Sequence, residues 1–237
     1  MSPLDSDSHD ASSSNDSFWN EHAKTESPTF RGHYQRQVAE QEEEFVVSQL
    51  LPKVNRVLEV GPGLGRVTRH LEKFTNKVVV CDISSYVIEQ LEERFNDSPN
   101  VELNRLALEQ VEELPDYGLF DAAVAIRTIP YVENWTAALR TLRNAVRPGG
   151  IILFDLWCRQ SSEYFMFRAK LEQEPVPAHR LAISEIDEGL RNLGVSIVAT
   201  YKWGYPRLGA FNTDFLGSLL FPNRAYSTTF CCKTIEH

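Results

Sequence analysis

The sequence predicts an α/β protein built on a doubly wound, seven-stranded and mostly parallel sheet, with an antiparallel last strand and helices on both faces. Two patterns carry this prediction. Between residues 35 and 160, short apolar runs alternate with amphipathic helical segments, which is typical of parallel strands joined by crossover helices. Residues 195–203 and 224–233 are two longer apolar segments with no helical pattern between them, which indicates an antiparallel pair at the edge.

The length and composition suit a single globular domain. The chain has 237 residues, of which 42% are hydrophobic and 11% aromatic, so it can bury a sizeable core. Residues 1–16 are rich in Ser and Asp and nearly free of apolar side chains, so we expect a disordered tail. Residues 17–237 then form the domain, and Phe18 and Trp19 are expected to begin a short helix that packs on it.

The first half of the domain alternates strands and helices. Residues 35–51 are expected to form an amphipathic helix whose acidic residues Glu42, Glu43 and Glu44 face solvent. Ser84 is a candidate N-cap for the helix after the second strand. In chain order, strands are expected at 53–60, 77–82, 100–106 and 120–126, with the first crossover helix at 65–74.

The second half continues this alternation and then departs from it. A helix at 133–146 is expected to be closed by the turn Arg147-Pro148-Gly149-Gly150, and the fifth strand follows at 151–156. The long connection 204–223 contains Gly, Pro and many apolar residues, which makes it a candidate lid or substrate insertion. The remaining helices are expected at 160–170 and 184–193.

The most informative segment follows the first strand and reads Glu59-Val60-Gly61-Pro62-Gly63-Leu64-Gly65-Arg66. Glycines at alternate positions lack Cβ atoms, so the backbone of such a turn can approach a ligand closely. The dinucleotide-binding fingerprint would need a glycine where Arg66 stands. The spacing therefore disfavours a nicotinamide dehydrogenase.

Two further segments fall at the same edge of the predicted sheet. Asp82 ends the second strand, where an acidic side chain can accept hydrogen bonds from both hydroxyls of a ribose, although it could equally cap the next helix. The backbone after the third strand, at residues 106–109, could bracket an adenine ring. Because ligands of open α/β sheets bind at the carboxyl ends of the strands, these segments predict one nucleoside-binding site.

The glycine spacing resembles the first motif of the class I S-adenosylmethionine-dependent methyltransferases. Residues 120–126 are similar to the fourth-strand motif of that family, and residues 142–153 to its turn into the fifth strand. The resemblance covers residues 35–160 well, which makes them the expected cofactor-binding core, and covers residues 184–235 by pattern only. It implies S-adenosyl-L-methionine as the cofactor.

Carried over position by position, the resemblance implies three groups of cofactor contacts. The amino-acid part of the cofactor would lie near Glu59, Gly61, Pro62, Gly63 and Gly65. The ribose would be bound by Asp82, and the adenine would lie near Ile83, Leu106, Ala107 and Leu108. The methionine moiety would lie beside Ile126 and Arg127.

The acceptor side carries weaker signals. The Asn/Asp-Pro-Pro-aromatic tetrapeptide of enzymes that methylate amino groups of DNA or glutamine is missing, as is the Pro-Cys nucleophile of cytosine C5 enzymes. Small-molecule relatives often place a histidine near position 130, where this chain has Pro130. The candidate catalytic residue is Asp155, which could orient or deprotonate an amine or hydroxyl, or serve as a helix cap or ion-pair partner.

Other residues near the acceptor side have two interpretations each. Arg127 could bind an acidic group or be a surface residue. His33 and Tyr34 precede a helix that often folds over the cofactor in this family, and the alternative for them is a purely structural role. An aromatic acceptor pocket or ordinary core packing are the alternatives for Trp157, Tyr205 and Phe211.

Composition excludes several classes of protein. The net charge is −9 and no cluster of Lys and Arg is visible, so a nucleic-acid partner is not expected. The four Cys show no metal-binding spacing, which predicts neither a metal site nor disulfides and favours the cytoplasm. No apolar run is long enough for a membrane span, and no secretory signal is expected.

We therefore expect an S-adenosylmethionine-dependent methyltransferase that moves a methyl group to an oxygen or nitrogen of a small-molecule acceptor by in-line displacement. A protein or peptide N-methyltransferase, including one acting on an N-terminal amine, is the first alternative. A non-catalytic cofactor-binding scaffold is the second. The oligomeric state is left open.

Overall fold

The computed structural model describes residues 17–24, 33–50, 54–161, 178–204, 219–220 and 225–235. The expected tail at residues 1–16 lies outside this set, as do nearly all of the expected helix at 160–170 and most of the connection 204–223. Tyr205, Phe211 and the side chains of His33 and Tyr34 are also outside it.

The sheet has the predicted character. Its strands run in the order β3-β2-β1-β4-β5-β8-β7, and β8 is antiparallel to both of its neighbours, whereas β1 to β5 are parallel. A two-residue strand, β6, pairs with the end of β5 and is an eighth member. The bounds are Arg56–Val60 (β1), Lys77–Asp82 (β2), Val101–Arg105 (β3), Phe120–Ala125 (β4), Val146–Cys158 (β5), Arg180–Leu181 (β6), Val195–Trp203 (β7) and Ser227–Thr234 (β8).

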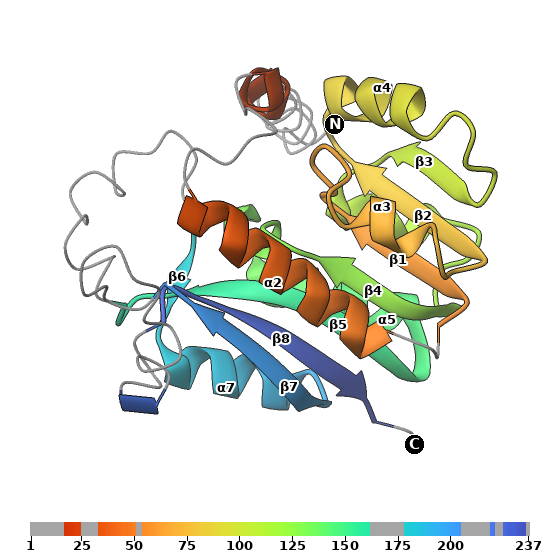
Figure 1. Cartoon of the computed structure of the whole chain (residues 1–237). Coiled ribbons are helices and arrows are strands. Elements are labelled where there is room, and N and C mark those ends of the chain that lie inside the picture. The colour runs from red at the N-terminus through yellow and green to blue at the C-terminus, as the bar shows by residue number, and fades with distance from the viewer. Residues whose placement is uncertain are drawn as a thin grey trace, which may run out of the picture.

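Helices cover both faces of the sheet (Figure 1). On one face, α2, α3 and α4 pack through Val46, Leu71 and Leu91 onto the apolar side chains of the central strands. On the other face, η1, α5 and α7 enclose a second core that contains Leu139 and Leu190. The bounds are His33–Leu50 (α2), Thr68–Leu71 (α3), Ser85–Arg94 (α4), Leu108–Glu113 (η1), Ile129–Tyr131 (η2), Trp135–Ala145 (α5) and Ile183–Asn192 (α7).

The fifth strand begins earlier than the sequence indicates. The expected turn at residues 147–150 lies inside β5, between the registered pairs Phe120↔Val146 and Ala122↔Ile151. Gly149 adopts a φ of +75°, so these residues form an outward bulge and the strand then resumes. A turn signal from Pro and Gly does not distinguish a bulge from a strand boundary, because both need the same backbone freedom.

The acidic face of α2 is not solvated, which corrects the prediction for two of its three glutamates. Glu42 is 0% exposed and Glu43 is 4% exposed, whereas Glu44 is exposed. Burial is possible because Arg66, Arg69 and His70 from the first crossover segment lie against the two carboxylates. A helical pattern alone does not reveal cations that another segment supplies.

The short helix expected at Phe18 and Trp19 is confirmed at residues 17–24. The Trp19 ring packs edge-on against Tyr131, with ring centroids 5.1 Å apart. The Asn20 side-chain oxygen accepts hydrogen bonds from the Ser84 hydroxyl and the Tyr86 backbone N–H at the start of α4. Helix 17–24 therefore contacts both the segment that follows β2 and the segment that follows β4. In the described part of the chain, no helix is both long and apolar enough to cross a membrane.

Candidate active site

The three glycines of the turn after β1 share one backbone conformation but differ in their surroundings. Gly61, Gly63 and Gly65 have φ angles of +67°, +54° and +75°, a region that favours glycine. A Cβ at Gly61 would lie 2.1 Å from the Thr128 hydroxyl, and one at Gly65 would lie 2.8 Å from the Phe95 ring. A Cβ at Gly63 would meet no atom of the described residues within 4 Å. Gly63 therefore presents bare backbone to an open space, as a ligand cradle requires.

Glu59 lies beneath this turn and holds it in place. Its carboxyl is buried and accepts a hydrogen bond of 2.7 Å from the Thr68 hydroxyl at the start of α3. Burial raises the pKa of Glu59 to about 7. The acidic residue of the motif thus joins the turn to the helix that follows it.

The three segments that the sequence assigned to the nucleoside meet at one edge of the sheet. The Gly61 backbone N–H donates to the Cys81 carbonyl at 2.9 Å, which places the glycine turn beside the end of β2. The Leu106 N–H donates to the Asp82 carbonyl at 3.1 Å, which places the segment after β3 beside Asp82. A side-chain oxygen of Asp82 accepts from the Ser84 N–H, and Ser84 caps α4 as predicted.

Arg127 has an unusual backbone. It follows β4 and Ile126, and its φ of +59° is the only positive value of a non-glycine residue among those described. Its N–H donates to a carboxylate oxygen of Asp155 at 2.5 Å, and its guanidinium donates to Glu42 at 3.3 Å. Such a conformation costs about 1 kcal/mol or more and persists where its surroundings enforce it. Arg127 is thus held in place by Asp155 and Glu42, and its contact with a cofactor stays a prediction.

Asp155 is completely buried on β5. One oxygen accepts from the Arg127 N–H, and the other accepts from the Ser227 hydroxyl at 3.2 Å. Burial, and then the charge of Glu42, raise the pKa of Asp155 to about 7. Both oxygens therefore have donors from the protein, and a catalytic role for Asp155 stays a prediction.

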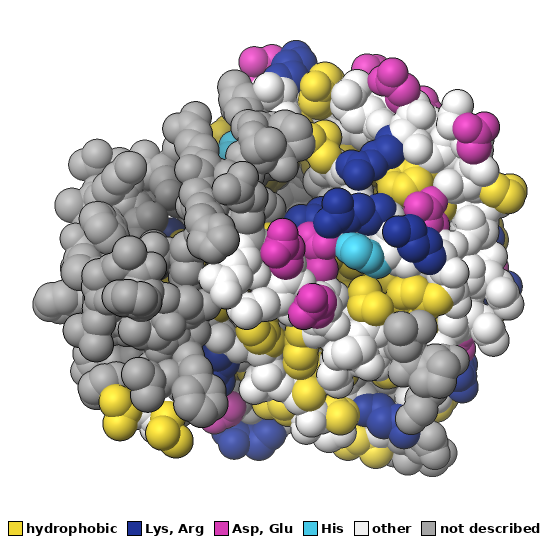
Figure 2. Space-filling model, viewed as in Figure 1, with side chains coloured by type: hydrophobic (Ala, Val, Ile, Leu, Met, Phe, Trp, Pro, Cys, Tyr) yellow, Lys and Arg dark blue, Asp and Glu magenta, His cyan; other side chains and the backbone are white. Residues whose placement is uncertain are grey.

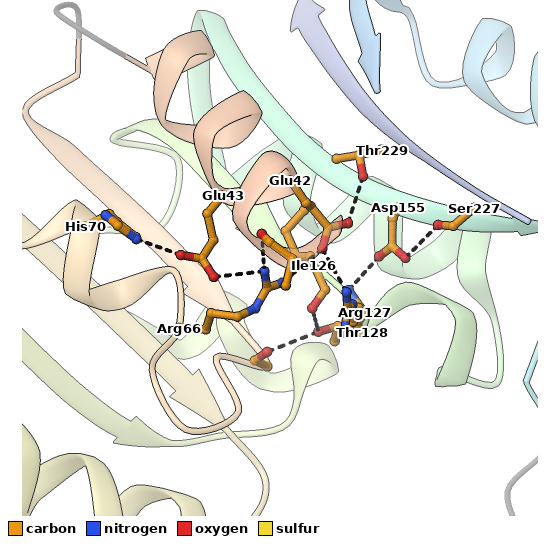
Figure 3. A network of polar contacts seen from close by, with 12 residues as sticks. Glu42, Glu43, Arg66, His70, Ile126, Arg127, Thr128, Asp155, Ser227 and Thr229 are labelled. Atoms are coloured by element: carbon orange, nitrogen blue, oxygen red, sulfur yellow. Dashed lines mark hydrogen bonds and ion pairs between the residues drawn. The ribbon is translucent and has the colours of Figure 1, made fainter. Parts of the chain in front are cut away.

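A polar network around Glu42 and Glu43 connects these parts, and sequence reasoning missed it (Figure 3). Glu42 accepts hydrogen bonds from Arg66, Arg127 and Thr229. Glu43 accepts from Arg66, Arg69 and His70. Burial alone would raise the pKa of Glu43, but the hydrogen bonds from Arg69 and His70 hold it below its usual value. Figure 2 shows Arg, Glu and His side chains gathered at the centre of this face.

A row of aromatic rings lies beyond Asp155, at the carboxyl ends of β5 and β7. We call Tyr131, Trp157, Tyr226 and Trp203 the aromatic row. Successive ring centroids are 5.2, 5.4 and 5.4 Å apart. The guanidinium of Arg180 lies 5.1 Å from the Trp157 ring, and that of Arg127 lies 5.8 Å from the Trp203 ring.

The row contains one of the three aromatic residues that the sequence singled out, Trp157. The other members of the row lie far from Trp157 in the sequence. Only the register of the paired strands brings them together. Trp157 and Trp203 are both paired in register with Ser227, one from each side.

Comparison with known proteins agrees with this geometry. A family model described as "Methyltransferase domain" matches residues 58–152, which run from within β1 to within β5 and include the glycine turn. The chain has the class I methyltransferase fold. The N-methyltransferase NodS of Bradyrhizobium japonicum, solved with S-adenosyl-L-homocysteine, superposes with a TM-score of 0.65 at 15% identity, over 92% of this chain and 98% of that one.

Two curated proteins match this chain over shorter stretches. Malonyl-[acyl-carrier protein] O-methyltransferase of Halalkalibacterium halodurans is 28% identical over 102 residues, which are 42% of this chain and 38% of that protein. tRNA 5-carboxymethoxyuridine methyltransferase of Escherichia coli K12 is 28% identical over 131 residues, which are 52% and 48%. The chain thus spans less than half the length of these curated relatives.

The sheet order and the family match agree with the fold class and the cofactor that the sequence predicts. The family match over residues 58–152 supports S-adenosylmethionine as the cofactor, and the structural neighbours share the fold. The residues present fit that group, because the open face of Gly63 and the side chain of Asp82 lie at the same edge of the sheet.

Proposed function

We propose that this chain transfers a methyl group from S-adenosylmethionine to an oxygen or nitrogen atom of a small-molecule acceptor. The open face of Gly63 is the observation that carries the proposal. It combines a backbone conformation that only glycine adopts easily with a space that the described residues leave unfilled, beside the carboxyl ends of β1 and β2.

Each neighbouring residue then has a definite task. The backbone at Gly63 would hold the amino-acid part of the cofactor, Asp82 the ribose hydroxyls, and Ile83 with residues 106–108 the adenine. Ile126 and Arg127 would lie beside the methionine moiety. When bound, S-adenosylmethionine supplies an activated methyl group on a sulfonium. The protein then contributes mainly by holding the acceptor lone pair in line with that group.

The relatives favour an oxygen acceptor. One is named as an O-methyltransferase of a malonyl group, and the other acts on a carboxymethoxy-substituted uridine of tRNA. Both names contain a group that carries a carboxyl. A tRNA acceptor is the second candidate on this ground, but the net charge of −9 favours a small molecule because binding to a phosphate backbone is driven by cationic side chains.

Calorimetric titration with S-adenosylhomocysteine tests the cofactor site. We expect the wild-type chain to bind and Gly63→Ala to bind at least about 10-fold more weakly, since the new methyl enters the ligand space. Gly194→Ala is the matched control, because Gly194 also has a positive φ (+63°) and open space around it but lies between α7 and β7. Equal affinity of the two variants, or no binding by the wild type, would contradict the proposal.

A turnover assay tests the acceptor class. The chain is incubated with labelled methyl donor and separated small-molecule, protein and RNA fractions of a cell extract. We expect label in the small-molecule fraction. Label confined to protein would favour the peptide N-methyltransferase, and label confined to RNA the tRNA alternative. Binding of S-adenosylhomocysteine without labelling of any fraction would leave the non-catalytic scaffold.

A further inference from the structure

We propose that the aromatic row, with Arg127 and Arg180, binds the acceptor, and that this acceptor is a carboxylate that becomes a methyl ester. This inference rests on the proposed methyl transfer and specifies its substrate class. The row lies at the carboxyl ends of β5 and β7, next to Arg127, which the family resemblance places beside the methionine moiety.

Two buried donors in the row point to a ligand. The indole nitrogens of Trp157 and Trp203 are buried and have no hydrogen-bond partner among the described residues, and the Trp157 residue is only 8% exposed. Leaving a buried N–H unsatisfied costs about 1–3 kcal/mol, so such groups usually have a function or a missing partner. Both groups are donors only, and the group that would satisfy them must therefore accept hydrogen bonds.

The cations around the row also favour a ligand that accepts hydrogen bonds. Guanidinium groups already lie over Trp157 and Trp203, at 5.1 Å and 5.8 Å from the ring centroids. A cage for a quaternary or protonated amine needs free aromatic faces, and a guanidinium already lies over each of the two indole rings. A planar anion, in contrast, suits indole N–H and guanidinium donors, and the rings offer an apolar surface to the rest of the acceptor.

The two carboxyl groups nearest to the row, Glu42 and Asp155, should repel a bound anion only weakly. Glu42 is engaged by Arg66, Arg127 and Thr229, and both oxygens of Asp155 accept hydrogen bonds. The raised pKa of Asp155 also reduces its negative charge near neutrality. Both carboxyls are thus already engaged by protein donors, which leaves neither well placed to take a proton from an acceptor hydroxyl or amine.

A carboxylate acceptor needs no such base. A carboxylate oxygen supplies the electron pair of the new O–CH₃ bond, while the S–CH₃ bond breaks and its electron pair stays on sulfur. No proton is released in this step. The product ester has lost the negative charge that Arg127 and Arg180 would recognise, which favours its release.

The chemical stability of the product tests the inference. The full chain is incubated with tritium-labelled methyl donor and a small-molecule extract, and the products are treated with mild alkali. We expect most of the label to become volatile as methanol, as methyl esters require. Alkali-stable label would overturn the carboxylate inference and leave the methyltransferase proposal standing. No label at all, from a chain that binds S-adenosylhomocysteine, would instead overturn the proposed function.

Single substitutions test the site itself. We expect Trp157→Phe, Trp203→Phe and Arg180→Gln each to lower kcat/KM for the purified acceptor about 10- to 100-fold, mainly through KM, with unchanged affinity for S-adenosylhomocysteine. Trp135→Phe is the control, because Trp135 packs against Gly189 of α7 on the opposite face. Full activity of both Trp157→Phe and Trp203→Phe would refute the assignment.

Discussion

The Arg66 guanidinium lies 2.9 Å from the carboxylate of Glu42. Arg66 directly follows the glycine turn, and Glu42 lies on α2, which precedes the first strand. Arg66, which stands where the dinucleotide fingerprint has a glycine, therefore also holds α2 against the sheet through Glu42.

Loss of the Glu42 charge should destabilise the fold strongly. In Glu42→Gln, the guanidinium groups of Arg66 and Arg127 would lose their shared counter-charge inside the protein, and we expect a loss of about 3 kcal/mol in the free energy of unfolding. Urea denaturation measures this change. Arg159→Ala, which breaks the exposed pair with Glu185, should cost less than about 1 kcal/mol. Similar losses in the two variants would mean that the buried network contributes no more than a surface pair.

Gly65 should tolerate no side chain. In Gly65→Ala, the new Cβ would lie 2.8 Å from Phe95 and 2.9 Å from Leu91, at a φ of +75°. We expect a loss of about 2–3 kcal/mol in unfolding free energy, together with weaker binding of S-adenosylhomocysteine, because α4 must move. The second change Phe95→Leu should restore part of the stability, whereas the φ strain remains. Absence of any rescue would argue against the clash with Phe95.

The pH dependence of stability should reveal the buried acid Asp155. Its pKa is raised from 3.8 to about 7 in the folded state, so its stabilising contribution is complete below pH 3.8 and is lost as the pH rises through 7. Between pH 5 and pH 8, the wild type should lose about 2 kcal/mol more than Asp155→Asn, which keeps an acceptor for the Arg127 N–H. Unfolding titrations at both pH values measure the difference. Parallel curves for the two proteins would show that Asp155 titrates normally.

The position of helix 17–24 should depend on the contacts that Trp19 and Asn20 make with the domain. Trp19→Ala removes the ring that packs on Tyr131, and Asn20→Ala removes the acceptor for Ser84 and Tyr86. We expect faster tryptic cleavage after Lys24 in each variant, because local detachment precedes proteolysis. Glu21→Ala, which removes the exposed pair with Lys24 and leaves Trp19 and Asn20 in place, is the control. Unchanged cleavage rates in the first two variants would contradict the docking role.

The order of the elements and the cofactor class could be predicted from the sequence, because both depend on local patterns. Apolar runs such as Val78–Val80 and the cap at Ser84 are signals within a few residues, and the spacing of Gly61, Gly63 and Gly65 needs no distant partner to be recognised. The expected strand at 77–82 and the antiparallel pair at the edge agree with β2, β7 and β8.

Tertiary structure alone decided the buried polar network and the aromatic row to which we assign the acceptor. Glu42 and Glu43 were predicted to be solvated because a helical pattern carries no information on cations from another segment, and the structure buries them against Arg66. The aromatic row likewise depends on strand register, which pairs Trp157 and Trp203 with Ser227. A cofactor turn is encoded by contiguous residues, whereas an acceptor site is assembled from side chains that only the finished sheet brings within contact distance.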